Sequence, residues 1–448
     1  MADPQTAIRP RPARGEELEL DVDTLAYGGR GVARADGFVV FVEGALPGDR
    51  VRARLTKSKR GYGEARVVEL LRPSDDRIEA SCMHEGELCP GAPWQQLPYE
   101  LQLRHKRDQV ADALGRIGRL EGYELEEIEP ALEHWRYRNK LEYSFGERED
   151  GELALGFHAR GRWDRILDAD DCKLASEANN AARNEVRDWA RYAAIPAYDR
   201  RAQTGALRNL VVREGRRTGQ LQTRLVTSAA EIPRPPADLH TVVEGPSGGT
   251  DGETGVMGRE YLEEEICGLR LRISPAAFFQ TNTEMAERLL AIATDYAGLA
   301  GSERLYDLYC GIGTIGLAMA GRAGEVWGIE TIPEAIADAQ ENARRNEIGN
   351  ASFMAGDART SIRPLVERAG PPDVVVVDPP RAGLSKKVVR RVIECDAKRI
   401  VYVSCNPTTL APNAAQLVEA GYRLRRVRPV DMFPQTPHIE CVAVLEKV

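Results

Sequence analysis

Apolar and polar residues alternate in short stretches from about Leu18 to Leu71, and glycine pairs or Pro-Gly steps separate these stretches. Alternation with a period of two is the pattern of a strand with one buried face. We therefore expect a small antiparallel β-barrel that ends at Pro73. The proline- and arginine-rich residues 1–15 before it are expected to form a disordered tail.

Helical and strand patterns are mixed in the middle of the chain. One helix is expected from about Tyr99 to Arg119, and an Ala-rich helix from about Ser176 to Tyr192. Between about Tyr137 and Thr227 the other apolar residues follow the pattern of strands. The proline- and glycine-rich stretch from Pro233 to Gly258 is expected to be a loop region or a hairpin insertion. This mixture predicts a central α+β region.

Strands and helices alternate regularly from Leu305 onward. Val374–Val377 is a run of valines, which is typical of a parallel strand buried on both faces. The alternation predicts a parallel sheet with crossover helices, as in a Rossmann-like domain. In such a sheet ligands bind in the crevice at the carboxyl ends of the strands, so residues that directly follow strands are the candidates for chemistry.

The composition limits the classes of function. A chain of 448 residues with 42% hydrophobic residues is long enough for two or three packed domains. Its net charge of -8 excludes a protein that is basic over its whole surface, so nucleic acid would have to bind at a local patch. One candidate lies between Arg50 and Arg72, where eight Lys or Arg residues accompany only Glu64 and Glu69. Taken alone, such a patch is more often a solvated surface.

No stretch of about 18 consecutive apolar residues is present, and the N-terminus lacks the basic and apolar regions of a signal peptide. We therefore expect a cytoplasmic protein without a membrane partner. Eight cysteines in such a chain indicate free thiols, metal ligands or catalysis rather than disulfides.

A glycine-rich turn follows the first strand of the predicted parallel sheet. The turn spans Cys310–Gly316 and has the form G-x-G-x-x-G, which fits either a dinucleotide or S-adenosylmethionine. The next strand ends on Glu330, where a carboxylate suits ribose hydroxyls, and a further strand ends near Asp357, which suits an adenine edge. Asp307 lies just before the turn and would repel a pyrophosphate but attract a cationic sulfonium. This charge favours the methyl donor over NAD.

Cys405 ends an apolar stretch and stands at the start of a predicted helix. Asn406 suits the N-cap, Pro407 the first helical position, and Gly421 the end of that helix. The positive end of the helix dipole is expected to lower the pKa of the thiol from its usual value of about 8.5 and so favour a nucleophile. The alternative is that Cys405 is a small core residue at a strand end.

Two acidic residues stand at comparable places on other strands. Asp378 follows the valine run, and Glu440 precedes the last apolar stretch. An acid, a thiol and a second acid are therefore expected at neighbouring strand ends.

The motifs in this order resemble the RNA uracil-C5 methyltransferases, in particular those that modify 23S ribosomal RNA. The resemblance rests on the glycine turn, on Asp378–Arg381 (DPPR), on Ser404–Pro407 (SCNP) and on His438–Cys441 (HIEC), and it extends to Ser274–Asn282. It implies an N-terminal OB-like TRAM barrel that binds RNA. The basic patch between Arg50 and Arg72 would then contact RNA phosphates. The implied domains are a tail at 1–15, the TRAM barrel at 16–72, a central α+β domain at 73–97 and 126–270, and a Rossmann-like methyltransferase domain at 98–125 and 271–448.

The same resemblance implies roles for individual residues. Cys405 would add to C6 of the uracil, and Glu440 would remove the proton from C5. Arg381 would stabilise developing charge on a carbonyl oxygen. The residues expected to bind S-adenosylmethionine are Gln280, Tyr309, Glu330 and Asp378. The implied partner is RNA, with 23S ribosomal RNA favoured over transfer RNA, and a monomer is expected.

Many relatives hold a [4Fe-4S] cluster with four cysteines. Cys82, Cys89 and Cys172 match three of these positions, but Ala92 stands at the remaining one. Because such a cluster usually takes four thiolates, either the cluster is lost or it has an open or substituted corner. His84 is the candidate substitute, and the alternative is that it is an exposed surface histidine, which is the commoner case.

Two other functions compete with this assignment. An RNA-binding assembly factor without turnover would not need both Cys405 and Glu440. Methylation of an adenine amino group normally requires an aromatic residue where Arg381 stands, and it requires no thiol.

Overall fold

The computed structural model describes residues 11–228, 232–233, 239–243, 261–275 and 277–448. The chain forms two compact units. The first consists of Met1–Ser81, Gly91–Gln109 and Pro434–His438, and the second of Cys82–Pro90, Val110–Phe433 and Ile439–Val448. The predicted class, a TRAM barrel followed by α+β and Rossmann-like parts, is confirmed. The predicted boundaries between these parts remain a prediction.

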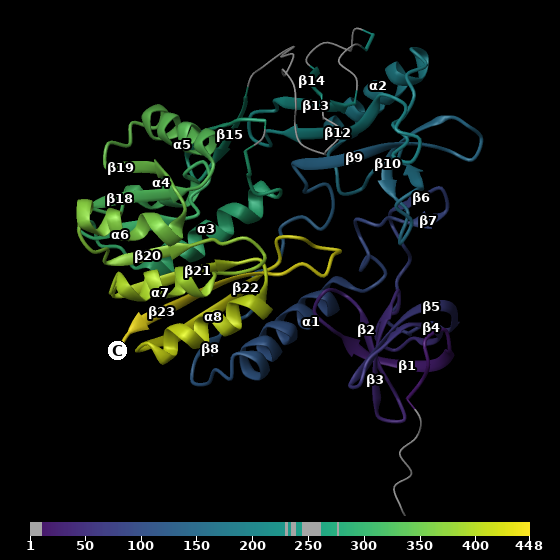
Figure 1. Ribbon diagram of the computed structural model, residues 1–448, viewed down its shortest axis with the longest axis horizontal. Helices are drawn as coiled ribbons and strands as arrows, with labels where there is room; N and C mark the ends of the chain where they lie inside the picture. Colours follow the sequence, from purple (N-terminus) through teal and green to yellow (C-terminus); the bar gives the residue numbers. More distant parts are fainter. Residues whose placement is uncertain (1–10, 229–231, 234–238, 244–260, 276) are drawn as a thin grey trace, which may run out of the picture. The chain divides into compact units, whose positions relative to one another are not determined.

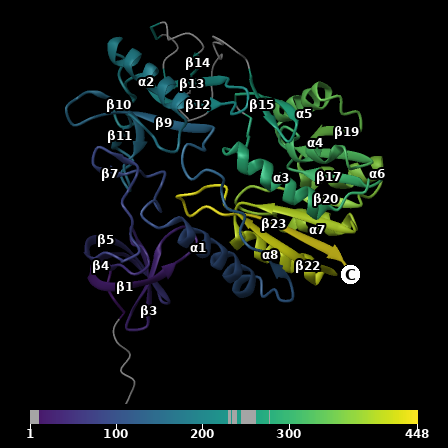
Figure 2. The same cartoon turned by 180° about the vertical axis from the view of Figure 1, so that it is seen from behind.

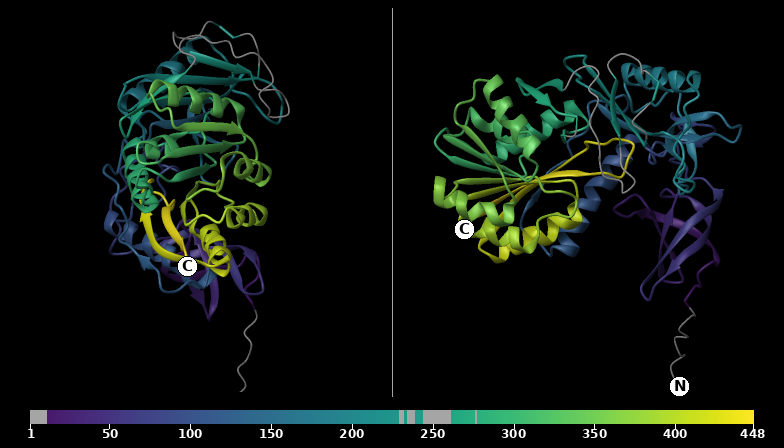
Figure 3. Two further views of the ribbon diagram at one scale, coloured as in Figure 1. Left: turned by 90° about the vertical axis from the view of Figure 1, so that its left-hand side faces the viewer. Right: turned by 45° about the horizontal axis from the view of Figure 1, so that its top comes forward.

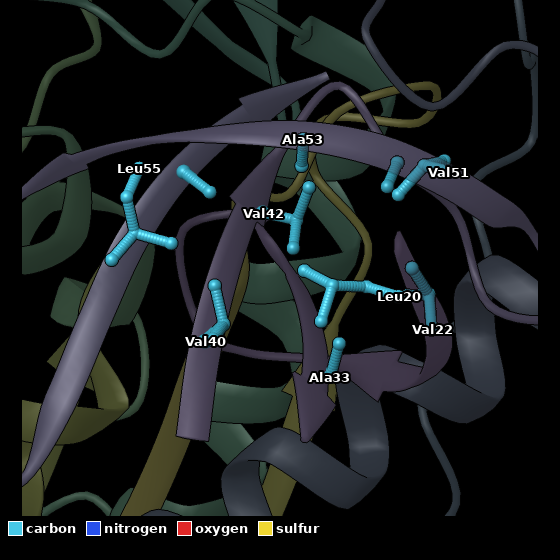
Figure 4. Packing of buried hydrophobic residues seen from close by; sticks show 10 residues of the cluster. Leu20, Val22, Ala33, Val40, Val42, Val51, Ala53 and Leu55 are labelled. Atoms are coloured by element: carbon cyan, nitrogen blue, oxygen red, sulfur yellow. The ribbon is translucent and has the colours of Figure 1, made fainter. Parts of the chain in front are cut away.

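The first unit contains a closed five-stranded barrel with the strand order β1-β2-β3-β5-β4. Its strands are β1 (Glu17–Leu25), β2 (Gly31–Ala35), β3 (Phe38–Glu43), β4 (Arg50–Ser58) and β5 (Tyr62–Arg72). Alternate residues such as Leu20, Val40 and Val51 point inward and fill the barrel, as Figure 4 shows. Of the predicted tail, residues 1–10 lie outside the described residues, whereas Gly15 donates a hydrogen bond to Leu55 of the barrel wall.

The helix predicted from Tyr99 is present as α1 (Tyr99–Asp112), and one π-helical turn (Ala113–Ile117) continues it. In the second unit, a six-stranded sheet has the order β11-β10-β9-β12-β13-β14, and α2 (Glu177–Tyr192) packs against it. Its strands are β9 (Lys140–Glu147), β10 (Leu153–His158), β11 (Ile166–Asp168), β12 (Leu207–Glu214), β13 (Leu221–Thr227) and β14 (Leu239–Val243). Strand β14 lies in the stretch expected to be a loop, most of which is outside the described residues.

Two small hairpins complete this part of the second unit. One consists of β6 (Met83–His84) and β7 (Glu87–Leu88), and the other of β15 (Leu262–Ile266) and β16 (Leu269–Ile273).

An eight-stranded sheet forms the rest of the second unit, with the order β19-β18-β17-β20-β21-β23-β22-β8. Its strands are β17 (Arg304–Leu308), β18 (Glu325–Glu330), β19 (Ala351–Ala355), β20 (Val374–Val377), β21 (Arg399–Ser404), β22 (Tyr422–Val430), β23 (Glu440–Lys447) and β8 (Glu124–Leu125). The five strands from β17 to β21 are parallel, whereas β23 is antiparallel to β21. The chain moves outward from β17 in one direction and returns to β20 on its other side, which is the switch point where such sheets bind ligands.

Helices cover both faces of this sheet (Figure 3). They are α3 (Thr283–Ala297), α4 (Thr314–Ala320), α5 (Pro333–Arg345), α6 (Ala358–Ala369), α7 (Lys386–Glu394) and α8 (Pro407–Glu419). The last three lie in front of the sheet in Figure 1, and α3 lies in front of it in Figure 2, which is seen from behind. All four valines of β20 are buried, as the unbroken apolar run predicts. In the part of the chain that the structure describes, no helix combines the length and apolarity needed to cross a membrane.

Candidate active site

The glycine turn after β17 has the backbone that its sequence predicts. Gly311 and Gly313 adopt positive φ angles of 54° and 85°, and Gly313 is the N-cap of α4. Tyr309 also has a positive φ of 68°, which is unusual for a residue with a large side chain. Glycine adopts a positive φ without strain, so the unusual backbone at this turn is that of Tyr309. Strained backbone of this kind is concentrated at ligand sites.

The four residues expected to bind the methyl donor line two adjoining cavities at this edge of the sheet. Gln280, Tyr309 and Asp378 line the first cavity together with apolar side chains from α3 and the glycine turn. Tyr309 and Glu330 line the second, which also includes Asp357. Tyr309 therefore separates an apolar cavity from a polar one, which suits a ligand with chemically different ends.

Glu330 is held in place by backbone hydrogen bonds. Its carboxylate accepts them from Thr331 at 2.6 Å, from Ile332 at 3.1 Å and from Gly311 at 3.3 Å. Asp357 is the N-cap of α6 and forms an ion pair with Arg359, which lowers the pKa of its carboxyl group. The Asp357 carboxylate already binds the backbone and the side chain of Arg359, so Asp357 supports the start of α6 as well as lining the cavity.

Asp307 has a different environment from the one expected. It is fully buried within β17, is not among the residues that line the two cavities, and accepts a hydrogen bond of 2.8 Å from the backbone of Gly316. Burial is the main cause that raises the pKa of Asp307 to about 7. A Cβ atom at Gly316 would lie 3.0 Å from the Asp307 carboxylate, so the third glycine of the turn allows α4 to approach β17 closely.

Two buried residues, Asn139 and Arg213, hold the backbone of the segment that carries Gln280, and neither was predicted from the sequence. Asn139 is 1% exposed and donates to the carbonyl of Gln280 at 2.9 Å and to Thr283 Oγ1 at 2.9 Å. Arg213 is also buried and donates to the carbonyls of Ser274 and Ala277, at 3.2 Å and 2.8 Å. Asn139 directly precedes β9 and Arg213 lies in β12, and only the fold places them beside this segment.

Cys405 lies at the predicted strand-to-helix junction. It directly follows β21, and Asn406 caps α8 by accepting a hydrogen bond of 3.0 Å from the backbone of Thr408. Pro407 is the first residue of α8, and Gly421 follows its C-cap with a φ of 96°, as predicted.

Glu440 lies opposite Cys405. In the antiparallel ladder between β21 and β23, the last pair is Ser404 with Cys441, so the next step along both strands faces Cys405 toward Glu440. Glu440 is 4% exposed, and burial raises its pKa well above the usual range. Asp378, whose own pKa burial raises to about 7, adds to this effect, and the charge of Arg381 opposes it.

The pKa of the Cys405 thiol is raised, whereas the dipole of the following helix was expected to lower it. Burial, followed by the charges of Glu440 and Asp378, raises it to about 12, whereas Arg381 lowers it. The dipole of α8 does not outweigh burial next to two carboxyl groups. The free protein therefore holds Cys405 as a thiol.

The loop with Arg381 is tied to the loop with Cys405. The side chain of Asn406 donates to the Arg381 carbonyl at 2.9 Å, and Thr409 Oγ1 donates to the same oxygen at 3.3 Å. The cap of α8 thus also fixes the backbone from which the Arg381 guanidinium extends.

Cys82, His84, Cys89 and Cys172 form a separate buried cluster in the second unit. The ligand atoms of the first three lie within 4.8 Å of one another, and the Cys172 sulfur interacts with the sulfurs of Cys82 and Cys89. These interactions lower the pKa of Cys172 and, with burial, raise the pKa of Cys82 to about 11. The residues that meet here supply three thiols and one imidazole, and they do not match the four thiolates of a [4Fe-4S] cluster.

The basic patch of the barrel is largely neutralised by ion pairs. On β4, Arg50 pairs with Glu19 at 3.2 Å and Arg54 with Glu17 at 2.6 Å. These pairs form because β1 places glutamates beside β4. The expected phosphate contacts of the patch remain a prediction. Lys59 and Arg60, in the loop after β4, form no ion pair with the residues that the structure describes.

Comparisons with known proteins agree with this architecture. The sequence model of the tRNA (Uracil-5-)-methyltransferase family matches residues 249–365 and 370–448, and that of the TRAM domain matches residues 12–68. An uncharacterized RNA methyltransferase of Halalkalibacterium halodurans is 38% identical, with 97% of each chain covered. One of Porphyromonas gingivalis is 38% identical, with 95% of this chain and 99% of the relative covered.

A solved structure extends the similarity to three dimensions. Pyrococcus abyssi tRNA (uracil-54, C5)-methyltransferase in complex with S-adenosyl-L-homocysteine has a TM-score of 0.78 and is 28% identical, with 96% of this chain and 100% of that chain covered. The similarity to this protein and to the bacterial relatives spans nearly the whole chain. The chain therefore belongs to the RNA uracil-C5 methyltransferase family.

Proposed function

We propose that the protein methylates C5 of a uridine in RNA, with Cys405 as the nucleophile, Glu440 as the base and S-adenosylmethionine as the methyl donor. The observation that supports this most strongly is the strand register that faces Cys405 toward Glu440. Asp378 links this pair to the first cavity, because its carboxyl group lines that cavity and its charge acts on both residues.

The first step is the addition of Cys405 to the base. C5 of uracil is a poor nucleophile, so the Cys405 thiol loses its proton to solvent and the thiolate sulfur forms a bond to C6. The electron pair of the C5–C6 double bond then moves toward C5 and the O4 carbonyl. Arg381 acts on the same region, since its charge lowers the pKa of both Cys405 and Glu440. We assign to Arg381 the stabilisation of the thiolate and of the enolate that succeeds it.

Glu440 acts after methyl transfer. C5 then carries both a methyl group and a proton, and the Glu440 carboxylate accepts that proton. The electron pair of the C5–H bond restores the double bond, and the C6–S bond breaks and returns the thiolate. A carboxylate in a buried site is a stronger base than one in water, so the position of Glu440 suits this task.

The cavities fit the methyl donor. S-adenosylmethionine supplies an electrophilic methyl group on a sulfonium. The backbone of the glycine turn allows close approach, since only open space lies within 4 Å of a Cβ atom at Gly311. Glu330 presents a fixed carboxylate for ribose hydroxyls, and Gln280, Tyr309 and Asp378 surround the other cavity.

We further propose 23S ribosomal RNA as the target, because the motifs resemble most the enzymes that act on it. The alternative is transfer RNA, because the similar Pyrococcus abyssi protein is a tRNA (uracil-54, C5)-methyltransferase. That protein matches 96% of this chain, so the barrel is not specific to ribosomal RNA enzymes. The cytoplasmic location and the monomeric state also remain predictions.

Mapping of 5-methyluridine in a deletion strain tests this proposal. We expect one site in 23S ribosomal RNA to lose its methyl group, wild-type protein to restore it, and Cys405→Ala protein to leave it unmodified. Loss of a site in transfer RNA instead would correct the target. Full restoration by Cys405→Ala protein would refute the mechanism.

A further inference from the structure

Cys82, His84 and Cys89 have the dimensions of a site for one metal ion, because their ligand atoms all lie within 4.8 Å of one another, and Cys172 lies beside them. The Cys82 sulfur lies 3.7 Å from His84 Nε2. Bonds of about 2.3 Å to sulfur and about 2.0 Å to imidazole nitrogen place two ligand atoms of a tetrahedron about 3.5 Å apart. The observed spacing therefore matches one edge of a tetrahedron around a single ion.

The interactions between the sulfurs lead to the same conclusion. The Cys172 sulfur interacts with those of Cys82 and Cys89, although it is not within 4.8 Å of all three other ligand atoms, and the Cys89 sulfur lies within 4.8 Å of that of Cys82. In a four-iron cluster each thiolate binds its own iron, and iron and sulfide lie between the thiolates. Sulfurs that contact one another around an imidazole leave room for one ion only.

The local backbone is shaped to bring these residues together. Cys82 and Cys89 flank the hairpin of β6 and β7, and Cys89 donates a backbone hydrogen bond of 3.1 Å to the Cys82 carbonyl. Glu85 and Gly86 turn the hairpin with φ angles of 47° and 79°. Two strands of two residues each form no stable sheet alone, so a tether at their open end would stabilise them.

Arg183 forms no ion pair with the residues that the structure describes, although its Nη2 atom donates to the Asp170 carbonyl at 2.6 Å and to Asn180 Oδ1 at 3.1 Å. It is fully buried, it interacts electrostatically with His84 and Cys172, and its Nε and Nη1 atoms have no hydrogen-bond partner among the described residues. An unpaired buried charge is costly. Three thiolates and one divalent ion would carry a net charge of -1, which would balance this guanidinium.

We propose that Cys82, His84, Cys89 and Cys172 bind one Zn²⁺ as a closed structural site, in place of an iron-sulfur cluster. Three thiolates and one imidazole form a common ligand set for structural zinc. All four residues are buried, and together they would fill the four coordination positions of the ion, so no coordination position is left for substrate. The ion would tether the hairpin to the loop between β11 and α2, which holds Cys172.

Metal analysis of the full chain, purified without oxygen from cells supplied with both zinc and iron, tests this proposal. We expect about one zinc per chain and no acid-labile sulfide. Iron with labile sulfide, or a folded protein without either metal, would overturn it. His84→Ala and Cys172→Ser should lose the zinc, whereas Cys267→Ser, which removes an exposed thiol outside the cluster, should retain it. Zinc retained in full by His84→Ala would refute the ligand set.

A titration of the wild type keeps the test valid if the variants do not fold. Protein stripped by a chelator should bind Co²⁺ and develop the visible bands of a tetrahedral thiolate site, and Zn²⁺ should then displace the cobalt. Hydrogen exchange at residues 82–90 should be faster in stripped protein than in zinc-loaded protein. Absence of the cobalt bands, or equal exchange rates, would contradict the proposal.

Discussion

Cys405 and Glu440 face each other one step beyond the last pair of the ladder between β21 and β23. The charge of Glu440 opposes ionisation of Cys405, because two negative charges would meet in a buried place. Their protons are therefore coupled, and the thiolate is favoured when Glu440 is protonated. The following predictions derive from this pair and from the residues around it.

Glu440→Gln should reduce turnover by about 10²- to 10⁴-fold, because the amide cannot accept the C5 proton. It should also cause methylated RNA to remain covalently bound to Cys405, as a band that survives denaturing electrophoresis. Glu446→Gln is the matched control, since Glu446 lies on the same strand and pairs with Arg399 and Arg425. A Glu440→Gln variant that turns over like this control would exclude Glu440 as the base.

The rate should rise with pH between about 7 and 9.5. The raised pKa values of Cys405 and Glu440 mean that both active forms, thiolate and carboxylate, become more populated as protons are removed. Arg381→Met should raise both pKa values further and lower kcat/KM at pH 7.5 by roughly tenfold, with a smaller loss at pH 9.5. Arg381→Lys, which keeps the charge, should retain most of the rate. A pH profile of Arg381→Met parallel to that of wild type would disprove this electrostatic role.

Asp307→Asn should stabilise the protein at alkaline pH. The folded-state pKa of Asp307 is raised to about 7, so wild type loses stability as the pH rises from about 4 to 7 and its unfolded form ionises first. The amide oxygen can still accept the hydrogen bond from Gly316. Relative to wild type, the free energy of unfolding should increase by on the order of 2–4 kcal/mol at pH 8 and by much less at pH 4.5, as measured in urea. A gain that is equal at both pH values would contradict the assignment.

Asn139→Ala should weaken binding of the methyl donor about tenfold, because the carbonyl of Gln280 and the hydroxyl of Thr283 both lose a buried donor. Calorimetry with S-adenosylmethionine measures this directly. Asn209→Ala is the control, since it removes a side-chain donor to Ser144 in the same sheet. Equal affinities of the two variants would show that Asn139 does not position the cofactor site.

Lys59 and Arg60 should contribute more to RNA affinity than Arg50 and Arg54, which are already paired with glutamates. Replacing both Lys59 and Arg60 with Gln should lower affinity and reduce the slope of log K against log salt by about 1–2. The double variant Arg50→Gln with Arg54→Gln serves as the control and should change the slope little. A larger effect of the Arg50 and Arg54 double variant than of the Lys59 and Arg60 double variant would show that β4 makes the phosphate contacts.

The sequence was sufficient for features that depend on neighbouring residues. The valine run of β20 and the Asn-Pro cap of α8 are local signals, and the structure contains both. Features that depend on distant residues were not predictable. Glu17 lies 37 positions from Arg54, yet β1 pairs it with that arginine. The same limit explains the pKa of Cys405, since the helix terminus is visible in the sequence but the burial and the facing acids are not.

The covalent step is tested most directly with RNA that contains 5-fluorouridine at the target position. Fluorine at C5 cannot be removed as a proton, so the enzyme should stop after methyl transfer with Cys405 bonded to C6. In the presence of S-adenosylmethionine, we expect wild-type protein to form a stable protein–RNA adduct whose peptide maps to Cys405, and Cys405→Ala to form none. No adduct with wild type, or an equal amount with Cys405→Ala, would contradict the assignment of Cys405 as the nucleophile.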